Sequence, residues 1–298
     1  MKTIIACLLT FYCSFNVMAQ PEPVMFEKGV VSNDAVFGFT LSPDASHALW
    51  VQSNGGRRDT LYIKEARVID GKVQTPKLAA FSAGAAMGKW KDIDPLFSPD
   101  GNTILFQSTR PVPAKPERKG FDIWAINKLT NNEWSEPRHL GNNINSDSSE
   151  SFASVSNTGN IYFTGNLPGH KGGTDIYMSR FSNGSYQPPQ NLGNPINTSE
   201  RESNPFIAAD ESYLIYFSTT ASGVSNDVDL YISYSKDGVW QTPVNLGTPV
   251  NSLLAEFCPF FHPQQKRLYF ARQQKRSEGP GMIENIYSVP FDPMAWKN

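Results

Sequence analysis

Short apolar clusters recur along the chain, and a turn signal precedes most of them. Ser98-Pro-Asp-Gly101 stands before Ile104-Leu-Phe106, and Ser156-Asn-Thr-Gly159 stands before Ile161-Tyr-Phe163. These clusters are too short for ordinary helices, and Pro, Asn and Gly at the intervening positions favour tight turns. The pattern therefore predicts many short β-strands rather than helices.

Four signals return in a fixed order at intervals of about 53 residues. They are an acid followed three residues later by a small residue or proline, a turn with an apolar strand, an Asp or Asn before an apolar-aromatic pair, and an aromatic residue followed three residues later by proline. The third signal falls at Asp122, Asp175, Asp229 and Asn285. A four-stranded unit repeated at this period is typical of a β-propeller blade, because one blade buries both of its faces only by stacking in a ring.

A weaker unit before these brings the number of units to five. We predict an all-β, five-bladed propeller of four-stranded antiparallel blades in a single domain over residues 20–298. The blades span residues 36–83, 92–146, 150–198, 202–252 and 256–290. Residues 23–31 resemble the outer-strand segment of an earlier unit, so we expect them to complete the last blade and close the ring. The alternative of six blades needs another unit around residues 79–90, which is too short.

Charge and composition narrow the classes of function. The formal net charge is −2, which argues against a nucleic-acid binder of uniformly basic surface. Aromatic residues make up 12% of the chain, and Gly and Pro number 22 each. This composition suits strands and turns, but it indicates no chemical activity.

The first residues read as an export signal. Lys2 precedes an apolar run over residues 4–12, and Ala19 offers a small residue for cleavage. We expect residues 1–19 to be removed and the mature protein to be periplasmic or secreted. A lipoprotein attached through Cys7 is the alternative, but it leaves too short an apolar region. No later stretch approaches the ~18 apolar residues of a membrane-spanning helix, and Cys258 is the cysteine left in the mature chain.

Several of these motifs are similar to known repeats. Ser98-Pro-Asp-Gly101, Gly172-Gly-Thr-Asp175-Ile-Tyr177 and Trp240-Gln-Thr-Pro243-Val-Asn-Leu246-Gly247 resemble the WD40-like Pro-Asp repeats of TolB-type propellers. The resemblance covers about residues 36–290. It implies an exported bacterial protein in which the propeller serves as a binding platform.

One face of the predicted propeller collects long loops. The loops between second and third strands share this face with the connections from each outer strand to the next blade, and such loops commonly carry binding residues. We predict a basic rim around an acidic centre, a charge pattern that orients a partner. The candidate binding residues are Arg57, Arg58, Arg110, Arg118, Lys119, Lys171, Arg272, Lys275, Arg276, Asp147 and Glu200.

The recurrent acids Asp92, Glu150, Glu202 and Glu256 admit two interpretations. Carboxylates projecting from successive inner strands could converge on the axis and act as a catalytic acid and base, as in five-bladed glycosidases. Repetition in every blade instead favours an architectural role, in which each carboxylate accepts backbone hydrogen bonds between blades. We therefore assign no catalytic residue and keep these four as the alternative candidates.

Other chemistries lack support in the sequence. His47, His139, His170 and His262 lie at different positions of different units, so we predict no metal site and no cofactor. Two hypotheses remain for the function. The first is a binding scaffold, expected to be a monomer, for a protein or a cell-envelope glycan, with no nucleic-acid partner and no integral membrane segment. The second is a carbohydrate-active enzyme that uses axial carboxylates.

Overall fold

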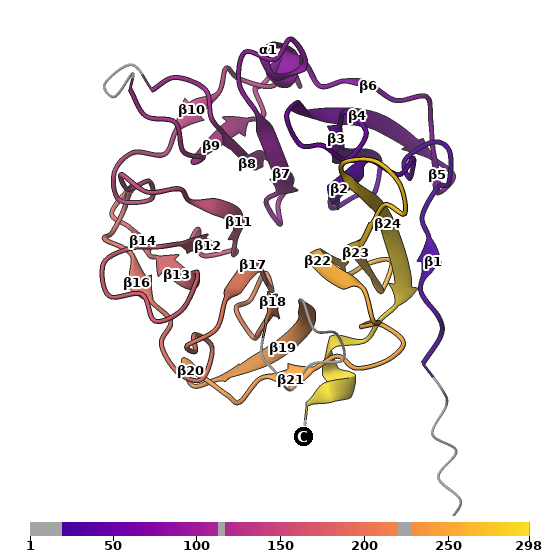
Figure 1. The fold of residues 1–298 in the computed structure, drawn as a ribbon. Helices are drawn as coiled ribbons and strands as arrows, with labels where there is room; N and C mark the ends of the chain where they lie inside the picture. Colours follow the sequence, from indigo (N-terminus) through magenta and orange to yellow (C-terminus); the bar gives the residue numbers. More distant parts are fainter. Residues whose placement is uncertain (1–19, 113–116, 220–227, 298) are drawn as a thin grey trace, which may run out of the picture.

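The computed structural model describes residues 20–112, 117–219 and 228–297. The predicted signal peptide at residues 1–19 lies outside the described residues. Figure 1 shows the described chain running once around a ring, with the sheets arranged like blades around a central axis. Within this part of the chain, no helix is long and apolar enough to cross a membrane.

The described residues form five antiparallel blades, which confirms the predicted fold class. Blade 1 contains β2 (Val36–Leu41), β3 (His47–Ser53), β4 (Leu61–Ile69) and the short outer strands β5 (Lys72–Val73) and β6 (Lys77–Leu78). Blade 2 contains β7 (Asp92–Phe97), β8 (Thr103–Ser108), β9 (Asp122–Asn127) and β10 (Arg138–His139). Between them, η1 (Ala80–Ser82) and α1 (Ala83–Ala86) occupy the segment that a sixth blade would have needed.

The remaining blades repeat this plan. Blade 3 contains β11 (Ser151–Val155), β12 (Ile161–Gly165), β13 (Asp175–Ser179) and β16 (Gln190–Asn191), with a hairpin of β14 (Phe181–Ser182) and β15 (Ser185–Tyr186) beside it. Blade 4 contains β17 (Glu202–Ile207), β18 (Tyr213–Ser218), β19 (Asp229–Lys236), β20 (Val239–Trp240) and β21 (Val244–Asn245). Blade 5 contains β22 (Ala255–His262), β23 (Arg267–Lys275) and β24 (Met282–Pro290), and η2 (Pro293–Trp296) follows it.

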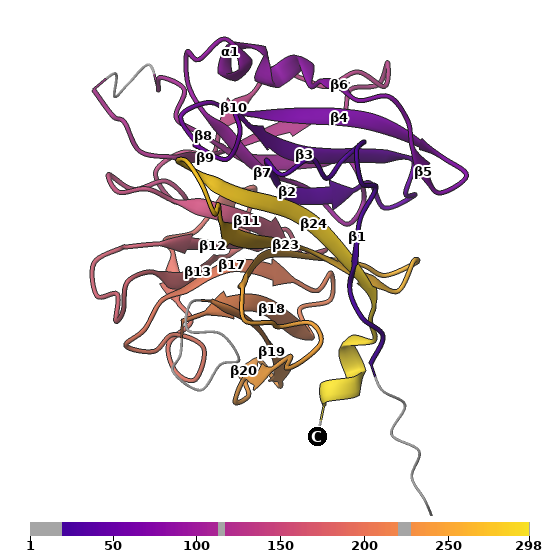
Figure 2. The ribbon, with the colours of Figure 1, turned by 45° about the vertical axis from the view of Figure 1, so that its right-hand side comes forward.

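The N-terminal strand closes the ring, as predicted. Strand β1 (Val24–Met25) pairs antiparallel with β24 and supplies the outer edge of blade 5. Figure 2 shows β1 alongside β24, although the two are far apart in the sequence. The strand is shorter than the expected residues 23–31, because the chain turns at Glu27, whose carbonyl accepts hydrogen bonds from the backbone N–H groups of Val30 and Val31. The first and last parts of the described chain therefore share one sheet.

The core lies between blades and follows the sequence period. One position of each second strand carries a large ring that is almost entirely buried: Trp50, Phe106, Phe163, Tyr216 and Phe270. Each such ring stabilises the fold by roughly 1.5–3 kcal/mol through the apolar surface it removes from water. Repeating this position around the ring gives each blade a ring that packs in one of four buried hydrophobic clusters.

In blades 2, 3 and 4, a recurrent asparagine fastens the outer loop to the third strand of its own blade. In blade 3, Asn197 Oδ1 accepts a hydrogen bond from the Ile176 backbone N–H at 2.8 Å, and its Nδ2 donates to the Ile176 carbonyl at 2.8 Å. Asn145 and Asn251 make the same pair of bonds to Ile123 and Leu230. The amide therefore takes the place of a missing backbone partner at a strand edge.

Candidate axial binding site

Every inner strand contains a bulge near the axis. At the bulge, one residue has a positive φ: 57° at Gly38, 48° at Asp94, 43° at Phe152, 57° at Asn204 and 51° at Cys258. The strand pairing shifts register next to each of these residues. A bulge bends a strand and redirects its side chains, so these positions shape the axial channel.

Glycine is required at the bulge of blade 1. A Cβ atom on Gly38 would lie 2.7 Å from Asp94 Oδ1 and 3.2 Å from the Asp94 Cα. The absent side chain therefore leaves the space that the Asp94 carboxylate occupies, and the positive φ adds a second reason for glycine.

A pocket of about 370 Å³ opens at the axis, on the face where the loops between second and third strands lie. All five blades contribute to its walls. The lining includes Phe37, Arg58, Lys91, Asp94, Arg201, Ser203, Asn204, Phe217, Phe257 and Cys258. Its surface combines aromatic rings with hydroxyl, amide, carboxylate and cationic groups, which is the composition of a small-ligand site.

Asp94 is the one carboxylate among the described residues that line this pocket. Its side chain is buried, and burial raises its pKa from 3.8 to about 6, against the lowering effects of the Cys258 hydrogen bond and the nearby Arg58 charge. Cys258 Sγ lies 3.4 Å from Asp94 Oδ1 and donates to it, and burial with the adjacent carboxylate raises the pKa of the thiol. Asp94 thus changes charge near pH 6, inside the pocket.

Arg58 is the cation whose charge acts on the Asp94 carboxylate. The Arg58 guanidinium lies 4.5 Å from the centre of the Phe37 ring and 5.6 Å from that of Phe257. It also forms an ion pair with Glu284, which is fully buried behind it and accepts a further bond from Gln273 Nε2 at 2.5 Å. These contacts fix the guanidinium at the pocket wall.

Two further cations stand immediately before the inner strands of blades 2 and 4. Lys91 and Arg201 each precede one of the recurrent acids, and both residues line the pocket. The Arg201 guanidinium lies 4.9 Å from the centre of the Phe217 ring. Besides Arg58, which is paired with Glu284, the described wall thus carries two basic residues and one acid, Asp94.

The recurrent acids predicted from the sequence do not line this pocket. Glu150, Glu202 and Glu256 are fully buried, and each accepts hydrogen bonds from the backbone N–H and the hydroxyl of the residue four positions earlier. Those donors are Ser146, Thr198 and Ser252. Each glutamate thus closes the loop that carries the chain from one blade into the next, which is the architectural interpretation of the repeat.

Asp92, the fourth of these acids, has the same buried placement with different donors. It accepts a hydrogen bond from Ser82 Oγ at 2.8 Å and from Arg110 at 3.1 Å. Arg110 in turn lies over the rings of Trp90, Phe106 and Trp124, at 4.9–5.3 Å from their centres. The Asp92 carboxylate is therefore held by the connection between blades 1 and 2.

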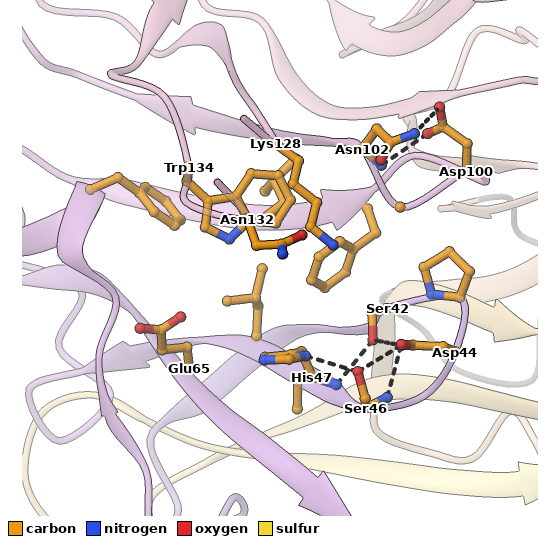
Figure 3. Close-up of a pocket in the computed structure, with 17 residues that line it drawn as sticks. Ser42, Asp44, Ser46, His47, Glu65, Asp100, Asn102, Lys128, Asn132 and Trp134 are labelled. Atoms are coloured by element: carbon orange, nitrogen blue, oxygen red, sulfur yellow. Dashed lines mark hydrogen bonds between the residues drawn. The ribbon is translucent and has the colours of Figure 1, made fainter. Parts of the chain in front are cut away.

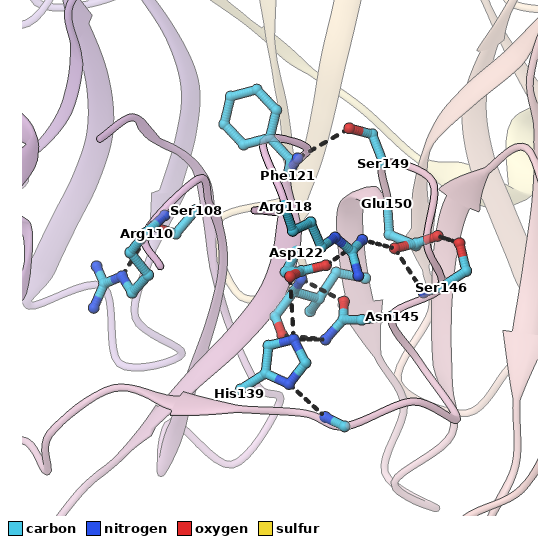
Figure 4. A network of polar contacts seen from close by, with 12 residues as sticks. Ser108, Arg110, Arg118, Phe121, Asp122, His139, Asn145, Ser146, Ser149 and Glu150 are labelled. Carbon is cyan, nitrogen blue, oxygen red and sulfur yellow. Dashed lines mark hydrogen bonds and ion pairs between the residues drawn. The ribbon is translucent and has the colours of Figure 1, made fainter. Parts of the chain in front are cut away.

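Four arginines of the predicted basic rim are not held apart from the acids. Arg58, Arg110, Arg118 and Arg272 turn inward and pair with carboxylates. Figure 4 shows one such network, in which Arg118 contacts Asp122 at 2.5 Å and Glu150 at 3.1 Å. The physical reason is desolvation: the acids are buried, and a buried carboxylate without a cationic or hydrogen-bonding partner is costly.

The glutamates differ from free carboxylates in their titration. Burial raises the pKa values of Glu150, Glu202 and Glu256, although the hydrogen bonds from the preceding Ser or Thr oppose this effect. Arg118 opposes it at Glu150, and Arg272, whose Nε lies 2.6 Å from Glu256 Oε1, opposes it at Glu256. Their environments are alike, whereas an acid and base pair needs unlike ones.

The other candidate binding residues stay at the surface and line none of the axial pocket. They are Arg57, Lys119, Lys171, Lys275, Arg276, Asp147 and Glu200. Lys171 Nζ donates to Asn194 Oδ1 at 3.0 Å, and Arg276 donates to the Gly55 carbonyl at 3.3 Å. The structure therefore brings only Arg58, of all the predicted rim residues, into the pocket wall.

Sequence reasoning missed Asp94, Asn204 and Lys91, and it did not include Arg201 among the candidate binding residues. The available signal was the third position of the first repeat motif, where Asp94, Phe152, Asn204 and Cys258 align. Polar residues at an inner-strand position of several blades indicate that the position faces a channel rather than the core. Lys91 and Arg201 were detectable in the same way, as basic residues directly before the acids.

Within the described residues, no group of three or more His, Cys, Asp or Glu side chains is arranged to hold a metal ion.

Comparison with known proteins supports the fold. No protein-family model matches the sequence, and no curated protein matches it. Among solved structures, an endo-arabinase from Bacteroides thetaiotaomicron is similar with a TM-score of 0.55 and 15% identity, over 92% of this chain and 98% of that one. An α-L-arabinofuranosidase from Lactobacillus brevis has a TM-score of 0.52 and 14% identity, over 89% of this chain and 92% of that one.

A third structure is a puromycin-hydrolysing peptidase from Mycobacterium tuberculosis, with a TM-score of 0.44 and 14% identity. The likeness covers 80% of this chain and 34% of the peptidase, so this chain spans about a third of that protein's length. At these identities, the first two structures show a shared β-propeller fold.

Proposed function

We propose that this protein is an exported propeller of TolB-like, WD40-like repeats that serves as a binding scaffold. Its axial pocket takes an acidic group of the ligand, which is a protein or a cell-envelope glycan. The observation that carries this proposal is the charge of the pocket wall. Lys91, Arg201 and Arg58 face a space in which Asp94 is the one described carboxylate, and Asp94 becomes neutral below about pH 6.

The arrangement suits recognition of a carboxylate better than it suits hydrolysis. Guanidinium and ammonium groups bind carboxylates by charge-assisted hydrogen bonds. A glycosidase of the usual type needs two carboxyl groups about 5–10 Å apart across its pocket. The four recurrent acids are engaged in loop closure and do not line this space. Phe37, Phe217 and Phe257 supply apolar surface for the body of the ligand.

Calorimetric titration with two acidic probes tests the proposal. We use trigalacturonate as the glycan probe and a hexaglutamate peptide as the protein probe, with maltotriose as the uncharged comparison. We expect one acidic probe to bind. We also expect this probe to be intact when the mixture is analysed after prolonged incubation. Absence of binding by both acidic probes, or displacement of the bound acidic probe by maltotriose, would contradict the proposal.

A carbohydrate-active enzyme is the second candidate, and two observations favour it. Burial raises the pKa of Asp94 to about 6, which is suitable for a general acid. The two structures with TM-scores above 0.5 reported above are described as an endo-arabinase and an α-L-arabinofuranosidase. Release of reducing sugar from arabinan or an aryl arabinoside, abolished by Asp94→Asn, would establish this alternative and displace the scaffold proposal.

Export is part of the proposal and has its own test. We propose cleavage after Ala19 and a periplasmic or secreted mature chain beginning at Gln20. N-terminal sequencing of the protein recovered from a bacterial periplasm should read Gln-Pro-Glu-Pro. Recovery of a chain that still begins at Met1, or of a lipid-linked Cys7, would contradict it.

A further inference from the structure

A second, larger space lies between blades 1 and 2, away from the axial pocket. It has a volume of about 520 Å³. One wall is formed by the turn between β2 and β3 and carries Ser42, Asp44, Ser46 and His47. Figure 3 shows the opposite wall, formed by Asp100, Asn102, Lys128, Asn132 and Trp134 of blade 2. We call this space the inter-blade cleft.

The inter-blade cleft is open because two bulky residues are missing. Between blades 3 and 4, the corresponding space holds Tyr162 and Glu211, whose side chains bond to each other at 2.8 Å. The same positions of the repeat, counted from the turn before each second strand, carry Leu49 in blade 1 and Gly101 in blade 2. A phenol and a carboxylate are thus replaced by an isobutyl group and a hydrogen atom.

The filled interface shows how tightly the space can be closed. Glu211 accepts hydrogen bonds there from Ser156, Thr158 and Asn160, in addition to Tyr162. Trp240 packs edge-on to Tyr162, with ring centres 6.3 Å apart. Trp134 occupies the position of Trp240 in blade 2, but at the inter-blade cleft no tyrosine stands across from it.

The walls of the inter-blade cleft carry polar groups that the described residues leave available. Asp44 Oδ1 accepts three hydrogen bonds from Ser42 and Ser46, while Oδ2 has no partner in the described part of the chain. Lys128 Nζ and the side-chain amide of Asn132 form no hydrogen bond with the other residues drawn in Figure 3. In Figure 3, Lys128 and Asn132 project from one wall toward the other.

The combination of groups fits a sugar better than other small ligands. A sugar ring presents an apolar face that packs on an indole and a rim of hydroxyls that bond to carboxylates and amides. The walls carry three acids, Asp44, Glu65 and Asp100, and one lysine, Lys128. This excess of negative charge disfavours an acidic sugar in the inter-blade cleft. We propose that the inter-blade cleft binds one neutral sugar residue of a glycan, with Trp134 as the stacking surface and Asp44, Asn132 and Lys128 as hydrogen-bonding groups.

This site is separate from the axial pocket and does not depend on it. The inter-blade cleft is lined mainly from the turns between first and second strands and between third and fourth strands, whereas the axial pocket is lined mainly by first-strand residues. Among the described residues, none lines both. The protein can therefore hold a neutral sugar at one place whatever the axial pocket binds.

Saturation-transfer NMR with glucose, galactose and N-acetylglucosamine as probes tests the proposal, with glucuronate as the acidic comparison. Trp134→Ala should weaken binding of the responding sugar by about tenfold or more, since stacking and part of the wall are lost. Trp240→Ala is the matched control, because it removes the same ring from the same repeat position beside a filled interface. Its binding should equal that of the unaltered protein.

A second variant keeps the test valid if Trp134→Ala is poorly folded. Leu49→Tyr places in blade 1 the ring that Tyr162 provides in blade 3, so it should fill the inter-blade cleft and abolish sugar binding while the circular dichroism spectrum is unchanged. The proposal is overturned if none of the neutral sugars binds, if glucuronate displaces the bound neutral sugar, if Leu49→Tyr binds normally, or if Trp134→Ala and Trp240→Ala weaken binding equally.

Discussion

Five residues with a left-handed backbone conformation surround the axis, and their side chains decide what the axial pocket contains. Gly38 leaves room, Asp94 brings a charge that titrates, and Cys258 donates a hydrogen bond to it. At the same bulge position, Asn204 accepts a hydrogen bond from the Cys258 backbone N–H at 3.0 Å. The chemistry of the pocket thus depends on individual residues that break the strand pattern, not on the residues that repeat.

The raised pKa of Asp94 predicts a pH-dependent loss of stability. Its pKa is 3.8 ordinarily and about 6 in the folded protein, so folding favours the protonated form. The corresponding stability is complete below pH 3.8 and is lost as the pH rises through 6, by about 3 kcal/mol in total. Asp94→Asn, which cannot ionise, should therefore stabilise the protein at pH 7.5 and have little effect at pH 4.

Urea unfolding of both proteins at the two pH values measures this difference. Asp237→Asn is the control, because Asp237 also has a positive φ, of 53°, but is exposed. It should change the free energy of unfolding equally at both pH values. An equal effect of Asp94→Asn at pH 4 and pH 7.5 would show that Asp94 is ionised without penalty.

At the scale of elements, outer strands of two residues are too short to hold the blades together by themselves. Strands β10, β16 and β21 each contain two residues. The recurrent asparagines supply the missing bonds, because each bridges its outer loop to the N–H and the carbonyl of one third-strand residue. The asparagine side chain therefore replaces the hydrogen bonds that one more residue pair between the strands would form.

Asn197→Ala should lower the free energy of unfolding by about 2–3 kcal/mol, because it removes the partner of the buried Ile176 N–H and one of the two donors to the Ile176 carbonyl, the other being the Leu192 N–H. Asn142→Ala, at an exposed position of a neighbouring outer loop, should change it by less than about 0.5 kcal/mol. Chemical denaturation of the two variants makes the comparison. Similar small effects of both would mean that the asparagine bridge contributes little.

At the scale of the whole molecule, stability depends on joining the two ends of the ring. Besides the β1–β24 pairing, the Phe26 ring lies 5.0 Å from Phe39 and 5.1 Å from Tyr269, so it contacts both blade 1 and blade 5. Ser32 Oγ donates to the Ile286 carbonyl at 3.1 Å and continues the junction. This segment therefore stabilises two blades at once.

Removal of residues 20–26 should lower the free energy of unfolding by at least about 3 kcal/mol, the usual cost of losing one large core ring. Removal of residues 20–22, which precede β1, should leave it unchanged. Thermal melts of the two truncated proteins provide the readout. If both melt like the full mature chain, the N-terminal strand does not close the ring in solution.

The sequence predicts the ring but not the pocket. The repeat signals follow strand order and turn chemistry, so they identify the five blades and the N-terminal closing strand. They do not identify the side chains that face the axis. A bulge changes which side chains face the channel, and the alternation assumed for a regular strand does not reveal where a bulge lies. Asp94 is the clearest case, since it lies only two residues after Asp92, the acid that the repeat identifies as a candidate.

The charge pairs escaped prediction for a different reason. Arg58 and Glu284 lie in the first and last blades and meet only because the ring closes. Arg118 and Glu150 belong to neighbouring blades, and burial of the acid selects the partner. Loop position in the sequence indicates that such residues share a face, but it does not show that they neutralise each other.

The central claim, that the axial pocket binds an acidic group through its cations, is tested most directly by calorimetric titration of Lys91 variants with the acidic probe that binds. Lys91→Ala should weaken binding about tenfold or more, and Lys89→Ala, at an exposed position outside the pocket, should have no effect. Binding by the unaltered protein should also tighten as the pH falls below about 6, where Asp94 becomes neutral. Equal affinities of the Lys91→Ala and Lys89→Ala variants would contradict the claim.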